Sequence, residues 1–555
     1  MRPERNQKPK SKVKSGCRTC KIRKVKCDEG YPSCRRCLST GRVCDGYGIW
    51  GGGSTTRTLT VSDVAPSLSP LAASAASTAQ DRLHLEWFRC RTSTKLPGTF
   101  VSGFWSTLLM QASLSEPVVL HAVLALSSVH RAGILDGDRQ PLGPCRVPAK
   151  REQYSLEHYG KAISSLRRHL STTDRTSLRI ALITCVTLVC MDFLRGHFST
   201  AQVHVRAGLE LLSSARPGPG GGRELADDWI AEVFSRLYVQ MELFQQPFQH
   251  RSLSLPVGEP RSIPLIFHTL KGAWVCLEML LRRVFDLRGQ ARSASRHPLP
   301  SALPEAQKLV QEELRGWLDT YEASSGMLRR QGGAEGDREY WLLRVYHTMA
   351  HIIAGTCLNP ENEGVFDRHT RHFVGIIKQS VALWVLSSTT THSTETWSPA
   401  TAAPQRLDMA ASIVDHGWIQ PLYYVASKCR VHRVRLHAVR LLERSFHREG
   451  IWDSDIAARA ARKIMEMEER GFYEGSTAEN FTIDSLPTAE DLSLPSLPES
   501  QRIRDVEMVL SGQPLDRVLL FCTKTQEDGT DRRIRIAEYH VASQRWTEVD
   551  APAES

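Results

Sequence analysis

The chain has 555 residues, of which 71 are Lys or Arg and 60 are Asp or Glu, so its formal net charge is +11 at pH 7. Residues 1–50 hold 14 basic and 4 acidic side chains, whereas the other 505 residues hold 57 basic and 56 acidic ones, which points to a nucleic-acid-binding head on a neutral body. No apolar run follows the N-terminal charges, so we expect no secretory signal. The longest apolar run, residues 180–194, is shorter than the ~20 residues that span a bilayer, so we expect no membrane segment.

The first six cysteines follow the repeated spacing C-x2-C-x6-C-x6-C-x2-C-x6-C. They are Cys17, Cys20, Cys27, Cys34, Cys37 and Cys44. Thiolates are the preferred ligands of structural zinc, and a C-x2-C pair lets two of them bind one ion. Two tetrahedral ions need eight ligand positions, which six thiolates supply if two of them bridge both ions. The two similar halves suggest that Cys17 and Cys34, the first cysteine of each half, are the bridges.

A basic segment, KIRKVK, lies between the second and third cysteines. We expect a short helix after Cys20 whose side chains point away from the metal and into the major groove, where Lys or Arg can donate to O6 and N7 of guanine. Cations around this segment suit phosphate contacts, which set affinity but carry no sequence information. The candidate DNA-contacting residues are Lys24, Arg23, Lys21, Lys26, Arg18, Arg36 and Lys14. The arm KPKSKVK also has the composition of a nuclear-import patch.

The segment CRTCKIRKVKCDEGYPSCRRCLSTGRVC resembles the fungal binuclear zinc-cluster DNA-binding domain in its six cysteines, its basic segment, Asp28 and Pro32. The resemblance implies two zinc ions, two pseudo-symmetric halves and a preference for short triplets such as CGG. It also implies that Lys24, three residues before Cys27, contacts the bases, with Arg23 as a helper. A disulfide knot is disfavoured without a secretory signal, and a metal store would not need the cations. The basic segment argues against a zinc module that serves protein contact alone.

Residues 51–80 are rich in Gly, Ser, Thr, Ala and Pro, which predicts a flexible linker. Many regulators with such zinc clusters carry a dimerising coiled coil here, but this sequence shows no sustained heptad of apolar positions. A homodimer through the linker is therefore unsupported, while a homodimer through the body and a monomer both stay open.

From residue 81 to residue 471 the hydrophobic period is that of a large helical domain. Ser115, Glu116 and Pro117 form a helix start, and Asp174 and Ser199 are expected to cap two later helices. Further helices are expected near residues 227–244, 269–287, 304–323, 338–357, 409–428, 431–448 and 455–470.

Two blocks of this body, residues 108–126 and residues 194–212, resemble the fungal-specific regulatory domain found behind such zinc clusters. The resemblance implies an all-helical middle domain that modulates activation and senses signals. From the residues themselves, Gly196 is interpreted as a helix end and Gly208 as a close contact between helices.

Residues 472–501 contain no Lys or Arg and interleave acidic with bulky apolar side chains. Such a composition suits an activation segment that presents apolar groups to a coactivator. A connection that follows the surface of the body is the slightly favoured alternative, because the acidic density is modest.

In the tail, residues 502–555, the segments RVLLFCTK and RRIRIAEYHV flank an Asp-Gly turn, which predicts a β-hairpin. Arg533 and Arg535 alternate with Ile534 and Ile536, which predicts one buried face. The basic face is expected to be solvated rather than to contact DNA.

No catalytic constellation is found. His347 and His351 are four residues apart on a predicted helix, but the glutamate that follows the first histidine of a metalloprotease motif is missing. We therefore interpret both as core or surface histidines and expect no enzyme.

The sequence thus predicts a mainly α protein: a zinc-cluster module with a basic arm (1–50), a linker (51–80), a helical domain (81–471), an acidic and apolar segment (472–501) and a tail with a hairpin (502–555). We expect a nuclear, zinc-dependent regulator of RNA polymerase II transcription that binds double-stranded DNA, with a coactivator or corepressor as a further partner and a metabolic or biosynthetic gene set as its target. The alternative is a zinc-dependent interaction protein that binds acidic partners or RNA without sequence choice.

Overall fold

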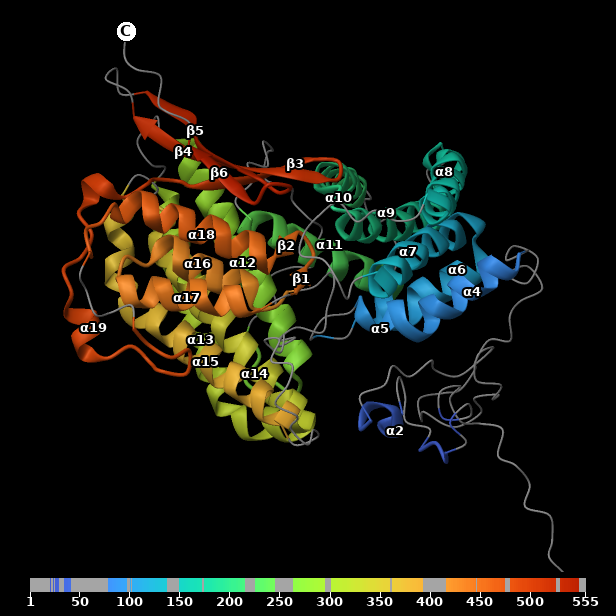
Figure 1. Cartoon of the computed structure of the whole chain (residues 1–555), viewed down its shortest axis with the longest axis horizontal. Coiled ribbons are helices and arrows are strands. Elements are labelled where there is room, and N and C mark those ends of the chain that lie inside the picture. The colour runs from blue at the N-terminus through green and yellow to red at the C-terminus, as the bar shows by residue number, and fades with distance from the viewer. Residues whose placement is uncertain are drawn as a thin grey trace, which may run out of the picture.

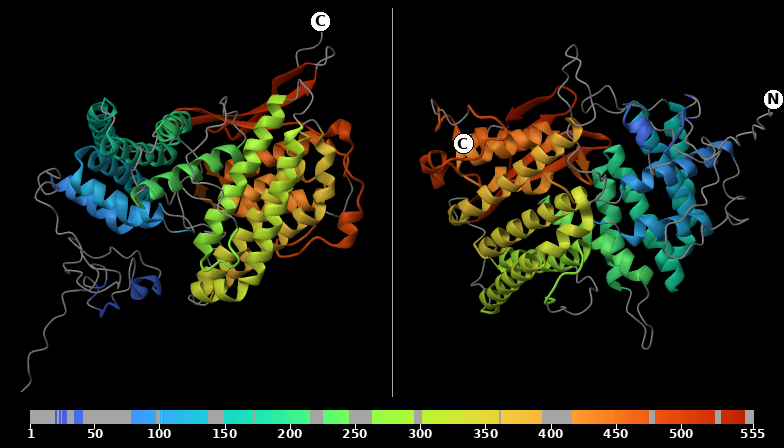
Figure 2. Two further views of the ribbon diagram at one scale, coloured as in Figure 1. Left: turned by 180° about the vertical axis from the view of Figure 1, so that it is seen from behind. Right: turned by 90° about the horizontal axis from the view of Figure 1, so that it is seen from below.

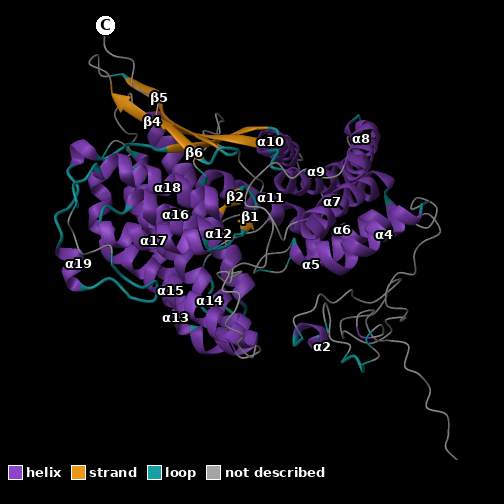
Figure 3. Ribbon diagram, in the orientation of Figure 1, coloured by secondary structure: helices purple, strands orange, loops and turns teal. Residues whose placement is uncertain are grey.

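A computed structural model describes residues 20, 23, 25–28, 34–40, 78–96, 100, 102–136, 149–171, 174–214, 225–244, 263–294, 301–359, 362–392, 416–445, 447–474, 480–525 and 530–548. Most of these residues are helical, and the strands gather mainly along one edge of the body (Figure 3), so the predicted mainly α class is confirmed. The expected linker lies almost entirely outside the described residues.

The helices form two groups that α11 (Leu225–Leu243) connects, and an antiparallel sheet borders both of them (Figure 1). The first group contains α4 (Ala79–Trp87), the π-helical turn η2 (Phe88–Thr92), α5 (Ser93–Lys95), the π-helical turn η3 (Phe104–Leu108), α6 (Leu109–Ser115), α7 (Pro117–Asp136), α8 (Ala149–Leu170), α9 (Arg175–Arg195) and α10 (Phe198–Ser214). The second contains α12 (Leu270–Ala294), α13 (Ala302–Ala323), α14 (Ser325–Thr356), the 3₁₀ helix η4 (Glu363–His369), α15 (Thr370–His392), α16 (Ile419–Lys428), α17 (His432–Arg444) and α18 (Ser454–Glu469). One hydrophobic core runs through both groups.

The ends of α7 and α9 follow the sequence signals. Pro117 occupies the first position of α7, where its missing N–H costs no hydrogen bond. The Asp174 carboxylate accepts a hydrogen bond from the Ser177 amide (2.8 Å) and so caps α9. At the other end, Gly196 takes a left-handed conformation (φ 72°), which confirms it as the helix end.

The expected cap at Ser199 is wrong. α10 already begins at Phe198, because the Ala201 amide donates to the carbonyl of His197 (3.0 Å), so Ser199 lies inside the first turn. Its hydroxyl instead accepts a hydrogen bond from the Gln513 amide group (2.6 Å), which comes from the C-terminal sheet.

Helix α9 is the one helix among the described residues that is long and apolar enough to cross a membrane. However, 78% of its apolar window is buried inside the protein, and α7, α8, α10 and α11 pack around it. Its hydropathy therefore fits the centre of a helical core.

Most predicted helices of the second group are found, with shifted ends. α14 extends the predicted helix at residues 338–357 back to Ser325, and the helix expected from residue 409 is described from Ile419. In this group, helix α15 and the short hairpin of β1 (Arg448–Glu449) and β2 (Trp452–Asp453) have no counterpart in the sequence analysis.

The predicted hairpin is confirmed as the centre of a larger sheet. β4 (Leu515–Thr525) pairs with β5 (Asp531–His540), with Cys522 opposite Ile534. β3 (Glu507–Gly512) and β6 (Arg545–Glu548) extend it to an antiparallel four-stranded sheet in the order β3-β4-β5-β6. Figure 2 shows the sheet from two further sides, along the outside of the helices. The sheet is fastened to the first group by the Leu515 amide, which donates to the Gly196 carbonyl (3.0 Å).

Two arginines of this sheet form ion pairs with its own carboxylates. Arg533 pairs with Glu507 (2.5 Å) and lies over the Phe521 ring (3.6 Å), while Arg535 pairs with Glu538 (3.0 Å). That this face is solvated rather than bound to DNA stays a prediction.

Residues 481–491 lie against α17. The Phe481 ring is covered by the guanidinium of Arg433 (3.2 Å) and that of Arg440 (4.1 Å), and the His437 Nε2 atom bonds to the Ile483 carbonyl (2.7 Å). Short helices α19 (Ala489–Ser493) and η6 (Glu499–Gln501) follow. A role of this segment in coactivator binding stays a prediction.

Candidate zinc centre and nucleic-acid interface

Three of the six N-terminal cysteines meet at one point. The Sγ atoms of Cys20, Cys27 and Cys34 all lie within 4.8 Å of one another, and those of Cys20 and Cys34 are 3.6 Å apart. Two thiolates on one tetrahedral zinc ion, with Zn–S bonds of about 2.3 Å, lie about 3.8 Å apart. The three sulfur atoms therefore fit a zinc ion, and Cys34 joins two cysteines of the other half of the repeat.

The described part of the module has almost no hydrophobic core of its own. Cys20 and Cys34 are fully buried, and Val25 and Cys27 are the partly buried side chains packed against them in the described part of the module. So few apolar contacts cannot stabilise a fold of this size. The cross-links that zinc supplies to the sulfur atoms replace the missing core.

An acidic residue ties the two halves together. The Asp28 carboxylate, one residue after Cys27, accepts hydrogen bonds from the backbone amides of Arg35 and Arg36, both at 2.9 Å. These amides begin the short helix α2 (Arg35–Leu38), whose N–H groups would otherwise lack partners. The position of Asp28 in the motif thus has a direct structural reason.

The described cations of the module differ in their surroundings. The side chains of Lys26 and Arg36 are exposed, as phosphate-binding groups must be. Arg23 is half-buried, and its Nη1 atom donates to the Thr40 hydroxyl (3.1 Å), which itself donates to the Arg36 carbonyl (3.0 Å). This bond links the basic segment to the second half of the module. Nothing in the cysteine spacing indicated a role for Thr40.

The other predicted site residues lie outside the described part of the chain. They are Cys17, Cys44, Lys14, Arg18, Lys21 and Lys24, together with the side chain of Cys37, whose backbone lies in α2. The helix expected after Cys20 also falls largely there. Val25–Asp28 are not helical, and the Val25 amide closes a turn by donating to the Cys20 carbonyl (3.1 Å).

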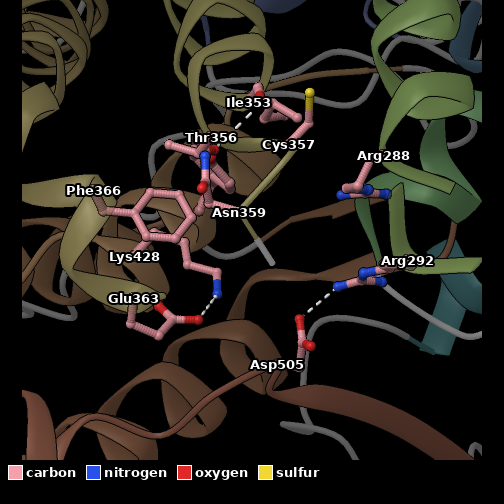
Figure 4. A pocket seen from close by; sticks show the side chains of 11 residues that line it. Arg288, Arg292, Ile353, Thr356, Cys357, Asn359, Glu363, Phe366, Lys428 and Asp505 are labelled. Atoms are coloured by element: carbon pink, nitrogen blue, oxygen red, sulfur yellow. Dashed lines mark hydrogen bonds and ion pairs between the residues drawn. The ribbon is translucent and has the colours of Figure 1, made fainter. Parts of the chain in front are cut away.

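A small pocket in the second helix group is lined by residues that include Arg288, Lys428 and Glu363 (Figure 4). Its volume is only about 50 Å³, which suits water rather than a metabolite. Its charges are already paired: Lys428 bonds to Glu363 (2.6 Å) and Arg292 to Asp505 (2.6 Å). The pocket therefore gives no argument for a bound effector.

Two known domains match the chain. The fungal Zn(2)-Cys(6) binuclear cluster domain matches residues 15–49, and the fungal specific transcription factor domain matches residues 89–398. Since the second match alone covers more than half of the chain, the protein belongs to the family of fungal transcription regulators with a two-zinc, six-cysteine cluster. The members of this family are transcription factors and not enzymes.

Curated relatives agree with this assignment. The aspercryptin biosynthesis cluster-specific transcription regulator atnN of Emericella nidulans is 24% identical over 543 residues, which cover 82% of this chain and 87% of the relative. The transcription regulator lscL of Purpureocillium lilacinum is 30% identical over 205 residues, or 36% of this chain and 49% of the relative. The transcriptional regulatory protein moc3 of Schizosaccharomyces pombe is 50% identical over 38 residues, covering 7% of this chain and 8% of the relative. No solved structure matches the chain.

Proposed function

We propose that this protein is a nuclear, sequence-specific regulator of RNA polymerase II transcription whose zinc cluster recognises CGG-like triplets in the major groove of DNA. The observation that carries the proposal is the meeting of Cys34 with Cys20 and Cys27, because it joins the two halves of the cysteine repeat. A basic segment held by such a metal-bound module is presented in one fixed orientation, which base recognition requires and mere attraction to acidic partners does not.

The roles of the cysteines follow from this proposal. Cys34 bridges the two zinc ions from the second half, and by the symmetry of the repeat Cys17 bridges them from the first. The short distance from Cys34 to Cys20 (3.6 Å) supports the first of these roles. When bound, zinc supplies structural cross-links only.

We assign base contact and phosphate contact to different residues. Lys24, helped by Arg23, contacts guanine, as the family resemblance implies. The bond from Arg23 to Thr40 supports a fixed orientation of the basic segment. Lys26 and Arg36 are exposed and contact phosphates, as do Lys14, Arg18 and Lys21. The strong basic charge of residues 1–50 adds sequence-independent affinity.

We further propose that the target genes belong to a metabolic or biosynthetic pathway. The support is the printed function of the relative atnN, which regulates a biosynthesis cluster and aligns with 82% of this chain. Nuclear import through the arm KPKSKVK fits the same role.

The direct test is selection of binding sites from random double-stranded DNA by the zinc-loaded full chain. We expect an enriched motif that contains a CGG-like triplet. Recovery of no motif, together with equal binding to RNA, would favour the zinc-dependent interaction protein instead.

Two variants separate the assigned roles. Lys24→Ala is expected to weaken binding to the selected site by ~1–3 kcal/mol, or roughly 5- to 150-fold, with little loss on scrambled DNA. Arg36→Ala serves as the matched control. Loss of a phosphate contact weakens binding to both DNAs alike, and it reduces the slope of log K against log salt concentration by about 1. Equal losses on both DNAs for Lys24→Ala would contradict base contact by Lys24.

A further inference from the structure

Three histidines meet where η4 connects α14 to α15. His351 lies near the end of α14, His369 ends η4 and His372 lies in the first turn of α15. Their imidazoles offer ring nitrogen atoms that all lie within 4.8 Å of one another. The ring centroids of His351 and His372 are 4.8 Å apart, and those of His369 and His372 are 5.3 Å apart.

A glycine makes this approach possible. Gly355 lies one turn after His351 on α14, and a Cβ atom at this position would come within 2.8 Å of the Cε1 and Nε2 atoms of His369. The missing side chain therefore leaves the space that the His369 ring fills. η4 is held from the other side by Arg502, which bonds to the Asp367 carboxylate (2.8 Å) and the Glu363 carbonyl (3.3 Å).

Two ring nitrogens of this group are not used by the surrounding described residues. The Nδ1 atoms of His369 and His372 are buried and have no hydrogen-bond partner among the described residues. One turn earlier on α14, His347 shows the contrast, because its Nε2 atom bonds to the Leu314 carbonyl (2.9 Å) and its ring stacks on Trp317. A buried polar atom without a partner destabilises the folded protein, so a ligand on these nitrogens would relieve that cost.

The three imidazoles are neutral at cellular pH. Burial, with the neighbouring histidines and Arg368, lowers the pKa of His369 to about 4. The pKa of His351 is lowered by burial, His372 and Arg315, and that of His372 by burial. A neutral imidazole has a free lone pair, which is the form that binds metal ions.

We propose that His351, His369 and His372 form a second metal site, for a divalent transition-metal ion that prefers imidazole, such as zinc. In a tetrahedral site with Zn–N bonds of about 2.0–2.1 Å, the nitrogens lie about 3.3 Å apart, so small side-chain rotations close the group around an ion. In the described structure the group contains no carboxylate or thiolate, which disfavours calcium, magnesium and copper(I). A fourth position is left for water or another ligand, and the ion would tie α14, η4 and α15 together.

The test is the zinc content of the full chain after saturation with zinc and removal of unbound metal. We expect three zinc ions per chain for the wild type and two for His351→Ala/His372→Ala. His121→Ala is the matched control, since His121 is also half-buried and faces another histidine, but its Nδ1 atom is bonded to the Nδ1 atom of His158 (3.1 Å). This control should keep three ions.

Cobalt(II) substitution gives an independent readout, because thiolate charge-transfer absorption reports the cysteine cluster alone. Removing the histidines should leave this absorption unchanged while one cobalt ion is lost. Two ions in the wild type, or the same loss in His121→Ala, would overturn the proposal. If the double variant does not fold, His351→Gln and His372→Gln singly should each weaken the third ion at least about tenfold, and unchanged affinity would equally overturn it.

Discussion

The guanidinium of Arg435 on α17 lies 2.6 Å from the carboxylate of Glu468 on α18, and neither side chain is exposed to solvent. Glu468 also pairs with Arg430 (2.9 Å) and accepts a hydrogen bond from the Ile503 amide (2.8 Å). Burial by itself would raise the pKa of Glu468, but Arg435, Arg430 and the Ile503 amide together bring it below its usual value. The second helix group thus contains a buried charged centre in which Glu468 faces two arginines.

Arg435→Met should destabilise the body strongly, because it leaves Glu468 buried with one cation fewer. Removal of one partner of a buried pair costs about 3–5 kcal/mol, which urea denaturation of the full chain would measure. Arg462→Ala is the control on the same two helices. Arg462 pairs with Glu443 at 2.6 Å, but about 40% of each side chain is exposed, so a loss below about 1 kcal/mol is expected. Equal losses for both variants would contradict the special role of the buried pair.

Cys27→Ala should abolish specific DNA binding and leave the helical body folded. The reason is that the described part of the zinc module has almost no core beyond its cysteines, whereas the body has its own. Cys276→Ala is the control, because burial, with Glu313, raises the pKa of that thiol to about 11 and so keeps it protonated. DNA binding would be measured by fluorescence anisotropy and helicity by circular dichroism. Full binding by Cys27→Ala, or by protein treated with a chelator, would refute the zinc assignment.

Gly208→Ala should destabilise the contact between α10 and α11. A Cβ atom at Gly208 would lie 2.3 Å from the Phe234 ring, and such overpacking costs about 1–3 kcal/mol. Gly160 in α8 is the matched control, because a Cβ atom there meets nothing within 4 Å. Gly160→Ala should therefore stabilise the helix by about 0.5–1 kcal/mol, the usual preference of helices for Ala over Gly. Melting temperatures that shift in the same direction for both variants would contradict this interpretation.

Asp192 gives a pH-dependent prediction. Burial raises the pKa of Asp192 to about 7, although Arg195 nearby lowers it. The folded state therefore binds a proton more tightly than the unfolded state, so this group's contribution to stability declines as the pH rises from about 4 to about 7. Asp192→Asn removes the cost of burying a charged carboxylate. It should stabilise the protein at pH 8 by about 1–3 kcal/mol, with no gain near pH 4.

Asp227 offers the opposite case for comparison. Burial alone would raise its pKa, but hydrogen bonds from Arg179 and Arg175 lower it to about 2. Its stabilising contribution is therefore present above the unfolded pKa and is lost as the pH falls towards 2. Asp227→Asn should destabilise the protein at pH 8, where Asp192→Asn stabilises it. Urea midpoints between pH 4 and pH 8 would show whether the two variants differ in sign.

The features predicted correctly from the sequence are those that local spacing determines. The cysteine repeat places three thiolates together, the helical period predicts most of the body, and Asp174 and Gly196 mark the ends of α9. Strands β4 and β5 are predicted because a short turn joins them.

The features that were missed depend on contacts between distant segments. Strand β3 also packs against α10 of the body, and β6 is too short for a clear alternation. His351 was noticed only beside His347, whereas its real neighbours are His369 and His372, which the fold of η4 brings to it. The bond from Arg23 to Thr40 likewise spans the two halves of the module, and no sequence spacing encodes it.

The bond from Leu515 to Gly196 has a consequence for protein synthesis. The first helix group emerges from the ribosome early, but the strand that fastens it, and Asp505 that pairs with Arg292, emerge only near the end of translation. The nascent chain therefore lacks both contacts until its last strands have emerged. A chain that stopped shortly after residue 500 would never make them, although the described long helices all lie before that point.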